Sequence, residues 1–196
     1  MILISLCLLI LMICIHIDLT DPLDNFIYQW LHGTINSNGV VVYLDIISNI
    51  FQPLHCLLMI LVILILVFIY NQFKFWWYGF WCFSVLLIGT FFKYIIQRPR
   101  PDISIDGYSF PSMHVLSVCL LVSLILLLKN NKWLTIICVL LVISIIISRI
   151  YLRAHFFTDT IGSILIIGIM LQALKVGNAT STQNNRWHYY PCIKTP

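Results

Sequence analysis

The stretch PSMHVLSVCLLVSLILLLKNNK, residues 111–132, shows the pattern from which the whole chain is built. A cluster of polar residues opens it, an apolar run follows, and a polar turn closes it. Ionisable side chains are costly beside a hydrocarbon layer, so a cluster of them at the end of an apolar run indicates a functional site. We therefore expect a membrane protein whose chemistry lies at the ends of its helices.

The composition of the chain supports the membrane interpretation. Of its 196 residues, 61% are hydrophobic and 9% are charged, whereas roughly half of the residues of a soluble domain are apolar. The formal net charge of +4 would suggest a nucleic-acid ligand in a soluble protein. In a membrane protein it reflects topology and anion chemistry instead, so we expect no nucleic-acid partner.

Six apolar runs approach the ~17–25 residues that a membrane-spanning helix needs. They predict spans at residues 2–17, 53–70, 75–96, 112–128, 133–149 and 159–174. The first run is short, but it lacks the basic start and the cleavage site of a secretory signal, and it is interpreted as a retained helix.

The connections between these runs complete the fold prediction. Asp21-Pro22 opens an amphipathic helix that closes at Gly33, and its length of about three turns predicts a position along the membrane surface. Residues 34–52 are studded with polar side chains and are expected to form a loop or the outer end of the next helix. The prediction is an all-α, polytopic membrane helical bundle with six transmembrane helices and a short interfacial helix after the first. Residues 1–174 would form its single domain and residues 175–196 a polar C-terminal tail.

The distribution of charge predicts the orientation in the membrane. With both termini in the cytoplasm, the inner loops and the tail carry Lys74, Lys129, Lys132, Lys175, Arg186 and Lys194. The outer cations all fall within the polar clusters at the helix ends: Lys93, Arg98, Arg100, Arg149 and Arg153. All seven acidic residues also lie outside. With the clustered cations set aside, the positive-inside rule predicts cytoplasmic termini and a site on the outer, periplasmic face of the cell (inner) membrane.

Three polar clusters carry the candidate functional residues. They are Lys93 with Arg100-Pro101, then Pro111-Ser112-Met113-His114, and then Ser148-Arg149 with His155 and Asp159. A phosphoryl group in transfer carries negative charge on its equatorial oxygens, so its catalysis needs positioned cations and amide donors. Lysine, arginine and the first free amides of a helix that starts at Ser112 are donors of this kind. The clusters therefore predict a phosphate site.

The two histidines of these clusters suit different roles. His155 and Asp159 are one helical turn apart, so the carboxylate can hold one imidazole nitrogen and leave the other free to attack phosphorus. An imidazole that titrates near neutral pH suits His114 to proton donation. The seven cysteines lie almost entirely in apolar runs and lack a metal-ligand spacing, so we expect them to pack in the core or face lipid, and we expect no metal site.

In this order the three clusters resemble the signature motifs of the type-2 phosphatidic acid phosphatase superfamily, which also includes bacterial acid phosphatases and vanadium haloperoxidases. The motifs lie within residues 93–159, and the six-span layout is similar to that of the membrane lipid phosphatase branch. One position departs from the family pattern. The second motif usually reads Pro-Ser-Gly-His, and Met113 replaces the glycine, which removes the close backbone approach that glycine allows but keeps an amide N–H.

The resemblance implies roles for individual residues. It implies that His155 is the nucleophile that forms a phosphohistidine, that His114 is the general acid, and that Asp159 completes the catalytic group. It implies phosphate binding by Lys93, Arg100, Ser112, Met113 and Arg149. It also implies an enzyme without a metal or a cofactor.

These residues predict hydrolysis of a lipid phosphate or diphosphate, with undecaprenyl diphosphate, phosphatidylglycerol phosphate and phosphatidic acid as candidate substrates. A lipid phosphotransferase, a lipid A phosphatase and a non-catalytic anion-binding membrane protein remain alternatives. The clusters are flanked by residues that either contact substrate or lie in a solvated loop, namely Arg98, Arg153, Asp102 and Asp106. His32, His55 and His188 are interpreted as structural or incidental. Lipids are the expected partners, and the oligomeric state is left open.

Overall fold

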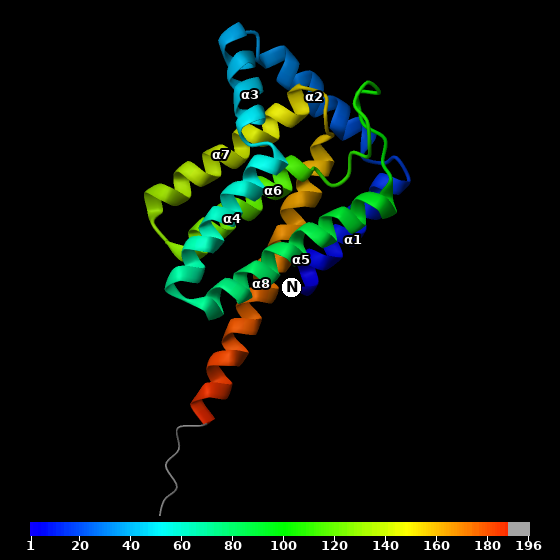
Figure 1. Cartoon of the computed structure of the whole chain (residues 1–196). Helices are drawn as coiled ribbons and strands as arrows, with labels where there is room; N and C mark the ends of the chain where they lie inside the picture. The colour runs from blue at the N-terminus through cyan, green and yellow to red at the C-terminus, as the bar shows by residue number, and fades with distance from the viewer. Residues whose placement is uncertain (188–196) are drawn as a thin grey trace, which may run out of the picture.

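The computed structural model describes residues 1–187, and within that range it contains eight α-helices and no strand (Figure 1). In chain order they are α1 (Ile2–His16), α2 (Asp21–Thr34), α3 (Asn38–Ile50), α4 (Pro53–Tyr70), α5 (Gln72–Ile96), α6 (Met113–Leu128), α7 (Lys132–Tyr151) and α8 (Phe157–Trp187). The predicted all-α class is confirmed. The tail residues 188–196, including His188, lie outside the described part of the chain.

Helix α6 is the centre of the bundle. All ten residues from Val115 to Leu124 are buried, and α4, α5, α7 and α8 pack around the helix. A helix that is apolar on every side is stable only when other apolar helices or lipid surround it. The site residues at the start of α6 are therefore held by the most enclosed element of the fold.

The membrane class is supported, but the predicted count of six spans is not confirmed. Among the described residues, four helices are long and apolar enough to cross a membrane, namely α4, α5, α7 and the part of α8 from Phe157 to Gly177. The α1–α2 pair would make a fifth, although its two helices are bent by 91°. Helix α6 and helix α3 are apolar but shorter. The chain is therefore an integral membrane protein with four or five candidate spans.

The short helix expected after the first run is present as α2. It starts at Asp21 with Pro22 in its first turn, where the missing N–H of proline costs no hydrogen bond. Helix α2 contacts α7 and α8, and it crosses the end of the bundle where the loops of the three polar clusters lie (Figure 1). The bend between α1 and α2 thus brings acidic residues over the start of α8.

Within residues 34–52, where a loop or an extension of the next helix was expected, residues Asn38–Ile50 form a helix of their own, α3. Leu44, Ile47 and Ser48 are buried at helical spacing, and α3 packs along α7. The polar residues that suggested a loop belong to an amphipathic helix. Helix α3 ends at Ile50 because Pro53 begins α4, and the residue before a proline disfavours helical geometry.

Two glycines allow close approaches that fix the start of α6. A Cβ added at Gly89 of α5 would overlap Leu116 of α6, and one added at Gly162 of α8 would overlap Phe110. Phe110 is fully buried and directly precedes the second polar cluster. These contacts hold the loop before α6 against both neighbouring helices.

The final helix is longer than the predicted sixth span. Helix α8 continues past residue 174 to Trp187, so regular structure extends into the segment predicted as a polar tail. The rest of that segment is not described.

Candidate active site

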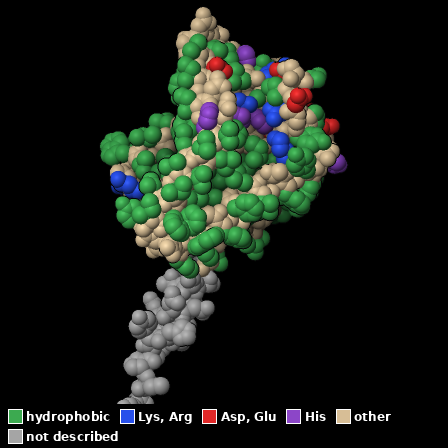
Figure 2. Space-filling view, in the orientation of Figure 1, with side chains coloured by type: hydrophobic (Ala, Val, Ile, Leu, Met, Phe, Trp, Pro, Cys, Tyr) green, Lys and Arg blue, Asp and Glu red, His purple; other side chains and the backbone are tan. Residues whose placement is uncertain are grey.

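The three polar clusters meet at one end of the bundle. Lys93 lies in the last turn of α5, Arg149 in the last turn of α7, and His114 in the first turn of α6. His114 lies within electrostatic reach of all three cations of the clusters and of His155. In Figure 2, Lys, Arg and His side chains gather toward the end that carries α2 and α3, and hydrophobic side chains cover most of the rest of this face. The structure thus brings together side chains that are far apart in the sequence.

Helix α3 holds Arg149 in place. The Nη1 atom of Arg149 donates a 2.7 Å hydrogen bond to the Oγ atom of Ser48, and the neighbouring Ser148 hydroxyl donates to the Leu44 carbonyl at 2.8 Å. The Nε atom of Arg149 is buried without a protein partner. A buried guanidinium N–H without an acceptor is costly, and a phosphate oxygen would satisfy it. Ser48 was missed by sequence reasoning, although its helical spacing from Leu44 was a usable signal.

The start of α6 offers further donors to an anion. Ser112 is the N-cap residue of α6, but its hydroxyl makes no capping bond, and it is buried without a partner. The Ser109 hydroxyl is also buried and unpartnered. The first amides of a helix have no intrahelical acceptor and favour negative charge. The Met113 side chain packs near Gly89 of α5, and its amide remains one of these donors.

His155 is almost completely buried and is held by a main-chain carbonyl. Its Nδ1 atom lies 2.8 Å from the Ser109 oxygen, and a carbonyl can only accept, so Nδ1 carries the proton. The Nε2 atom is then left with its lone pair. The nearest oxygen of Asp159 is 3.7 Å from Nδ1, so Nδ1 donates to the Ser109 carbonyl in place of the expected hydrogen bond to the Asp159 carboxylate. Asp159 acts on His155 through its charge.

The pKa of His155 is lowered from its ordinary value. Burial of the ring is the main cause, because it disfavours the charged form. The Asp159 carboxylate opposes this lowering, and the positive charges of Arg149 and Arg100 add to it. His155 is therefore neutral near pH 7, which is the state a nitrogen nucleophile requires.

Asp159 lies at the start of α8 and is fully buried. Its Oδ2 atom accepts a 2.9 Å hydrogen bond from the Phe156 amide, and its Oδ1 atom accepts one of 2.9 Å from Arg98 Nη1. A carboxylate at a helix N-terminus is also favoured by the helix dipole. Asp159 is thus fixed by two donors, one on each of its carboxylate oxygens.

Arg98 does not lie in a solvated loop, so that interpretation of the sequence was wrong: its side chain is buried against two carboxylates. Its side chain is 7% exposed and pairs with Asp24 of α2 at 2.9 Å as well as with Asp159. It also donates to the hydroxyls of Thr158 at 2.8 Å and Thr20 at 3.1 Å. Burial alone would lower the pKa of Arg98, but the two carboxylates raise it, so it stays charged. Sequence reasoning missed Asp24 because α2 was interpreted only as a packing helix.

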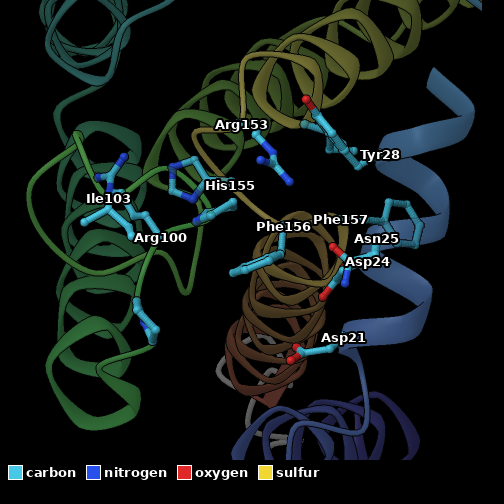
Figure 3. A pocket seen from close by; sticks show the side chains of 13 residues that line it. Asp21, Asp24, Asn25, Tyr28, Arg100, Ile103, Arg153, His155, Phe156 and Phe157 are labelled. Carbon is cyan, nitrogen blue, oxygen red and sulfur yellow. The ribbon is translucent and has the colours of Figure 1, made fainter. Parts of the chain in front are cut away.

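A cavity of about 420 Å³ opens beside His155 (Figure 3). It is enclosed by α2, the loop after α5 and the loop before α8, and Arg100, Arg153 and Phe156 line it. The Arg153 guanidinium lies 4.3 Å from the centre of the Tyr28 ring. This cavity connects the buried nucleophile candidate with the surface of the molecule.

The other polar residues singled out in the sequence do not line the cavity beside His155. Asp102 accepts a 2.9 Å hydrogen bond from the Ser104 amide, and the Ser104 side chain and this amide together lower the pKa of the Asp102 carboxyl. Asp106 is exposed. His32 and His55 contact main-chain carbonyls, as expected of structural residues. Within residues 1–187 no three His, Cys, Asp or Glu side chains are grouped as a metal site would require.

The model of the type-2 phosphatidic acid phosphatase (PAP2) superfamily matches residues 56–179 of this sequence, which include all three clusters. The chain belongs to the PAP2 superfamily. The family predicted from the clusters is therefore confirmed. The match includes position 113, where this chain has methionine in place of the glycine of the usual second motif.

Two solved structures share the PAP2 fold. The first transmembrane PAP2 type phosphatidylglycerolphosphate phosphatase from Bacillus subtilis superposes with a TM-score of 0.77 at 23% sequence identity, over 91% of this chain and 96% of that chain. LpxE from Aquifex aeolicus superposes with a TM-score of 0.62 at 18% identity, over 78% of this chain and 95% of that chain. At these identities the similarity shows the fold alone. No curated protein matched the sequence.

Proposed function

We propose that this protein is a membrane lipid phosphatase that hydrolyses a phosphomonoester or a diphosphate at the head of a lipid. The observation that carries the proposal is the convergence of two histidines with three cations at the ends of apolar helices. Three buried groups without a hydrogen-bond partner, on Ser109, Ser112 and Arg149, could each donate to a bound anion. The PAP2 family and the names of its two structural neighbours support a phosphatase.

In the first step, Nε2 of His155 attacks the phosphorus atom while the bond from phosphorus to the lipid oxygen breaks. His114 donates a proton to that oxygen, and the lipid leaves as an alcohol or as a lipid monophosphate. Lys93, Arg100 and Arg149 would neutralise the equatorial oxygens, together with the amides at the start of α6. The positive charge that develops on the His155 ring is stabilised by Asp159.

In the second step, a water molecule attacks the phosphohistidine. His114, now neutral, takes a proton from the water, the bond from phosphorus to Nε2 breaks, and inorganic phosphate is released. Neither a metal nor a cofactor enters this scheme, because the three cations supply the positive charge. Activity in EDTA equal to activity without it tests this part of the proposal.

The substrate is expected to be an amphiphile whose phosphate lies at the membrane surface and whose tail stays in lipid. The clusters lie at one end of apolar helices, and the charge distribution favours the outer face with both termini in the cytoplasm. Undecaprenyl diphosphate, phosphatidylglycerol phosphate and phosphatidic acid are the proposed substrates. The short loop between α5 and α6 leaves little room for a large headgroup pocket.

The test is phosphate release by the purified protein in detergent from a panel of these lipids and lipid A, with His155→Gln as the matched control. Release that His155→Gln abolishes supports the proposal. The absence of release from every lipid, with retained binding of vanadate, would point to an anion-binding protein instead. Incorporation of ¹⁸O from labelled water into the released phosphate distinguishes hydrolysis from transfer to a second lipid.

A further inference from the structure

We propose that Asp24 and Arg98 are positioning residues of the catalytic centre. Arg98 anchors Asp159, and Asp24 balances the charge of Arg98 so that the three side chains together present a net negative charge to His155. The inference rests on the proposed function, because the pair is assigned a role in the reaction at His155. It makes α2, which carries none of the three family motifs, a part of the active site.

The geometry of the pair is that of a bridge between two carboxylates. One guanidinium nitrogen of Arg98 lies 2.9 Å from Asp159 Oδ1, and the other lies 2.9 Å from Asp24 Oδ2. Both carboxylates are fully buried. Arg98 also lies over the Phe156 ring, 3.9 Å from its centre, so solvent does not screen these charges.

Asp24 also fixes the first turn of α8. Its Oδ1 atom accepts a 2.9 Å hydrogen bond from the Thr158 amide, and its Oδ2 atom accepts one of 2.7 Å from the Thr158 hydroxyl. Thr158 directly precedes Asp159. Asp24 therefore positions Asp159 twice, once through the backbone of α8 and once through Arg98.

The charges of the buried group explain why two acids are needed. If Arg98 had Asp159 as its only buried partner, the two charges would cancel, and little negative potential would reach the imidazole. With Asp24 present, the three side chains carry a net charge of −1, and Oδ2 of Asp159 lies 3.7 Å from His155 Nδ1. Attack by Nε2 makes the ring positive, and this net negative charge stabilises it.

The charges that act on His155 come from several different elements. They come from Asp159 on α8, Arg149 on α7, Arg100 in the loop after α5, and His114 on α6 when it is protonated. Arg98 pairs with Asp159, and Asp24 pairs with Arg98. A change in either residue of the pair alters this field without removing a group that contacts the substrate.

The test uses two charge-neutralising variants with a short-chain phosphatidic acid in detergent as the probe. Asp24→Asn removes a negative charge, so protonated His155 becomes less stable and the acidic limb of kcat/KM should move to lower pH. Arg98→Gln removes a positive charge, so the limb should move to higher pH. In both variants kcat should fall by about 10–100-fold, less than the ~10²–10³-fold loss of a donor that touches the transition state. KM should change less than kcat.

Two further variants complete the design. The double variant Asp24→Asn/Arg98→Gln removes both charges together, so its acidic limb of kcat/KM should return toward that of the wild type. The double variant also keeps the test available if one of the single variants does not fold. Asp21→Asn is the matched control, because Asp21 lies on the same helix but is half exposed and 3.4 Å from Arg98. Asp21→Asn should move the limb less than Asp24→Asn does.

If the pair had only a structural role, Asp24→Asn and Arg98→Gln would lower the midpoint of thermal unfolding and the yield of folded protein. The acidic limb of kcat/KM would then stay at the wild-type pH. The inference would be overturned if the acidic limb of kcat/KM stayed at the same pH in both single variants, or if it moved in the same direction in both. Equal shifts for Asp21→Asn and Asp24→Asn would also overturn it. If the wild type releases no phosphate from the probe or from the lipid panel, the proposed function fails instead, so the two failures are distinguishable.

Discussion

Substitution of Ser48 by alanine tests whether α3 belongs to the phosphate site. The Ser48 hydroxyl is buried and accepts a 2.7 Å hydrogen bond from Arg149 Nη1. Hydrogen bonds to charged groups contribute roughly 1.5–3 kcal/mol, and the lower end applies here because Arg149 keeps its charge. A loss of about 1.5 kcal/mol corresponds to slightly more than a tenfold fall in kcat/KM. The fall should appear in kcat/KM for every active lipid, since Arg149 is proposed to bind the phosphate that all of them share.

The assay is phosphate release over a range of lipid concentrations, at equal amounts of folded protein as judged by thermal melting. Tyr43→Phe is the control, because the Tyr43 hydroxyl also joins α3 to α7, through a 3.1 Å hydrogen bond to Ser144 that is exposed. This variant should keep the activity of the wild type. Wild-type kcat/KM in Ser48→Ala, or an equal loss in Tyr43→Phe, would refute the role given to Ser48.

His114→Ala should slow substrates with poor leaving groups most, since it removes the proposed general acid; equal losses for leaving groups of different pKa would contradict this role. The acidic limb of kcat/KM, corrected for titration of the substrate phosphate, should lie below pH 6.5, because the pKa of His155 is lowered and activity is lost only as pH falls through it. A limb above that value would contradict the buried neutral imidazole. Gly162→Ala should destabilise the protein by about 1–3 kcal/mol, because the added Cβ overlaps Phe110. Phe110→Leu in the same chain should recover part of that loss in thermal unfolding, whereas no recovery would show that the overlap is not the cause.

The general architecture followed from the sequence because it depends on local composition. Long apolar runs predict helices in a membrane, and α4, α5 and α7 lie close to the predicted ranges. The helix at residues 38–50 was not predicted, because its buried face consists of only a few residues, among them Leu44, Ile47 and Ser48. Polar residues on the remaining face of an amphipathic helix look like a loop when the partner helix is unknown.

The site followed from the sequence only in part. The residues proposed to touch phosphate form recognisable clusters, but the groups that hold them do not. Asp24 is 74 positions from Arg98, and no local pattern indicates that two such charges pair. The acceptor for His155 is the Ser109 carbonyl, and a main-chain acceptor leaves no mark on the sequence. Supporting contacts of this kind depend on the packing of α2 and α8, which the sequence does not reveal.

The most direct measurement of the central claim is the identification of the phosphorylated residue during turnover. Purified protein is mixed with a ³²P-labelled lipid phosphate, the reaction is stopped at alkaline pH, where a phosphohistidine survives, and the label is mapped to a peptide. We expect label on His155 in the wild type, none in His155→Gln, and more in His114→Ala, if proton transfer by His114 limits hydrolysis of the intermediate. Label on another residue, or undiminished label in His155→Gln, would contradict the account.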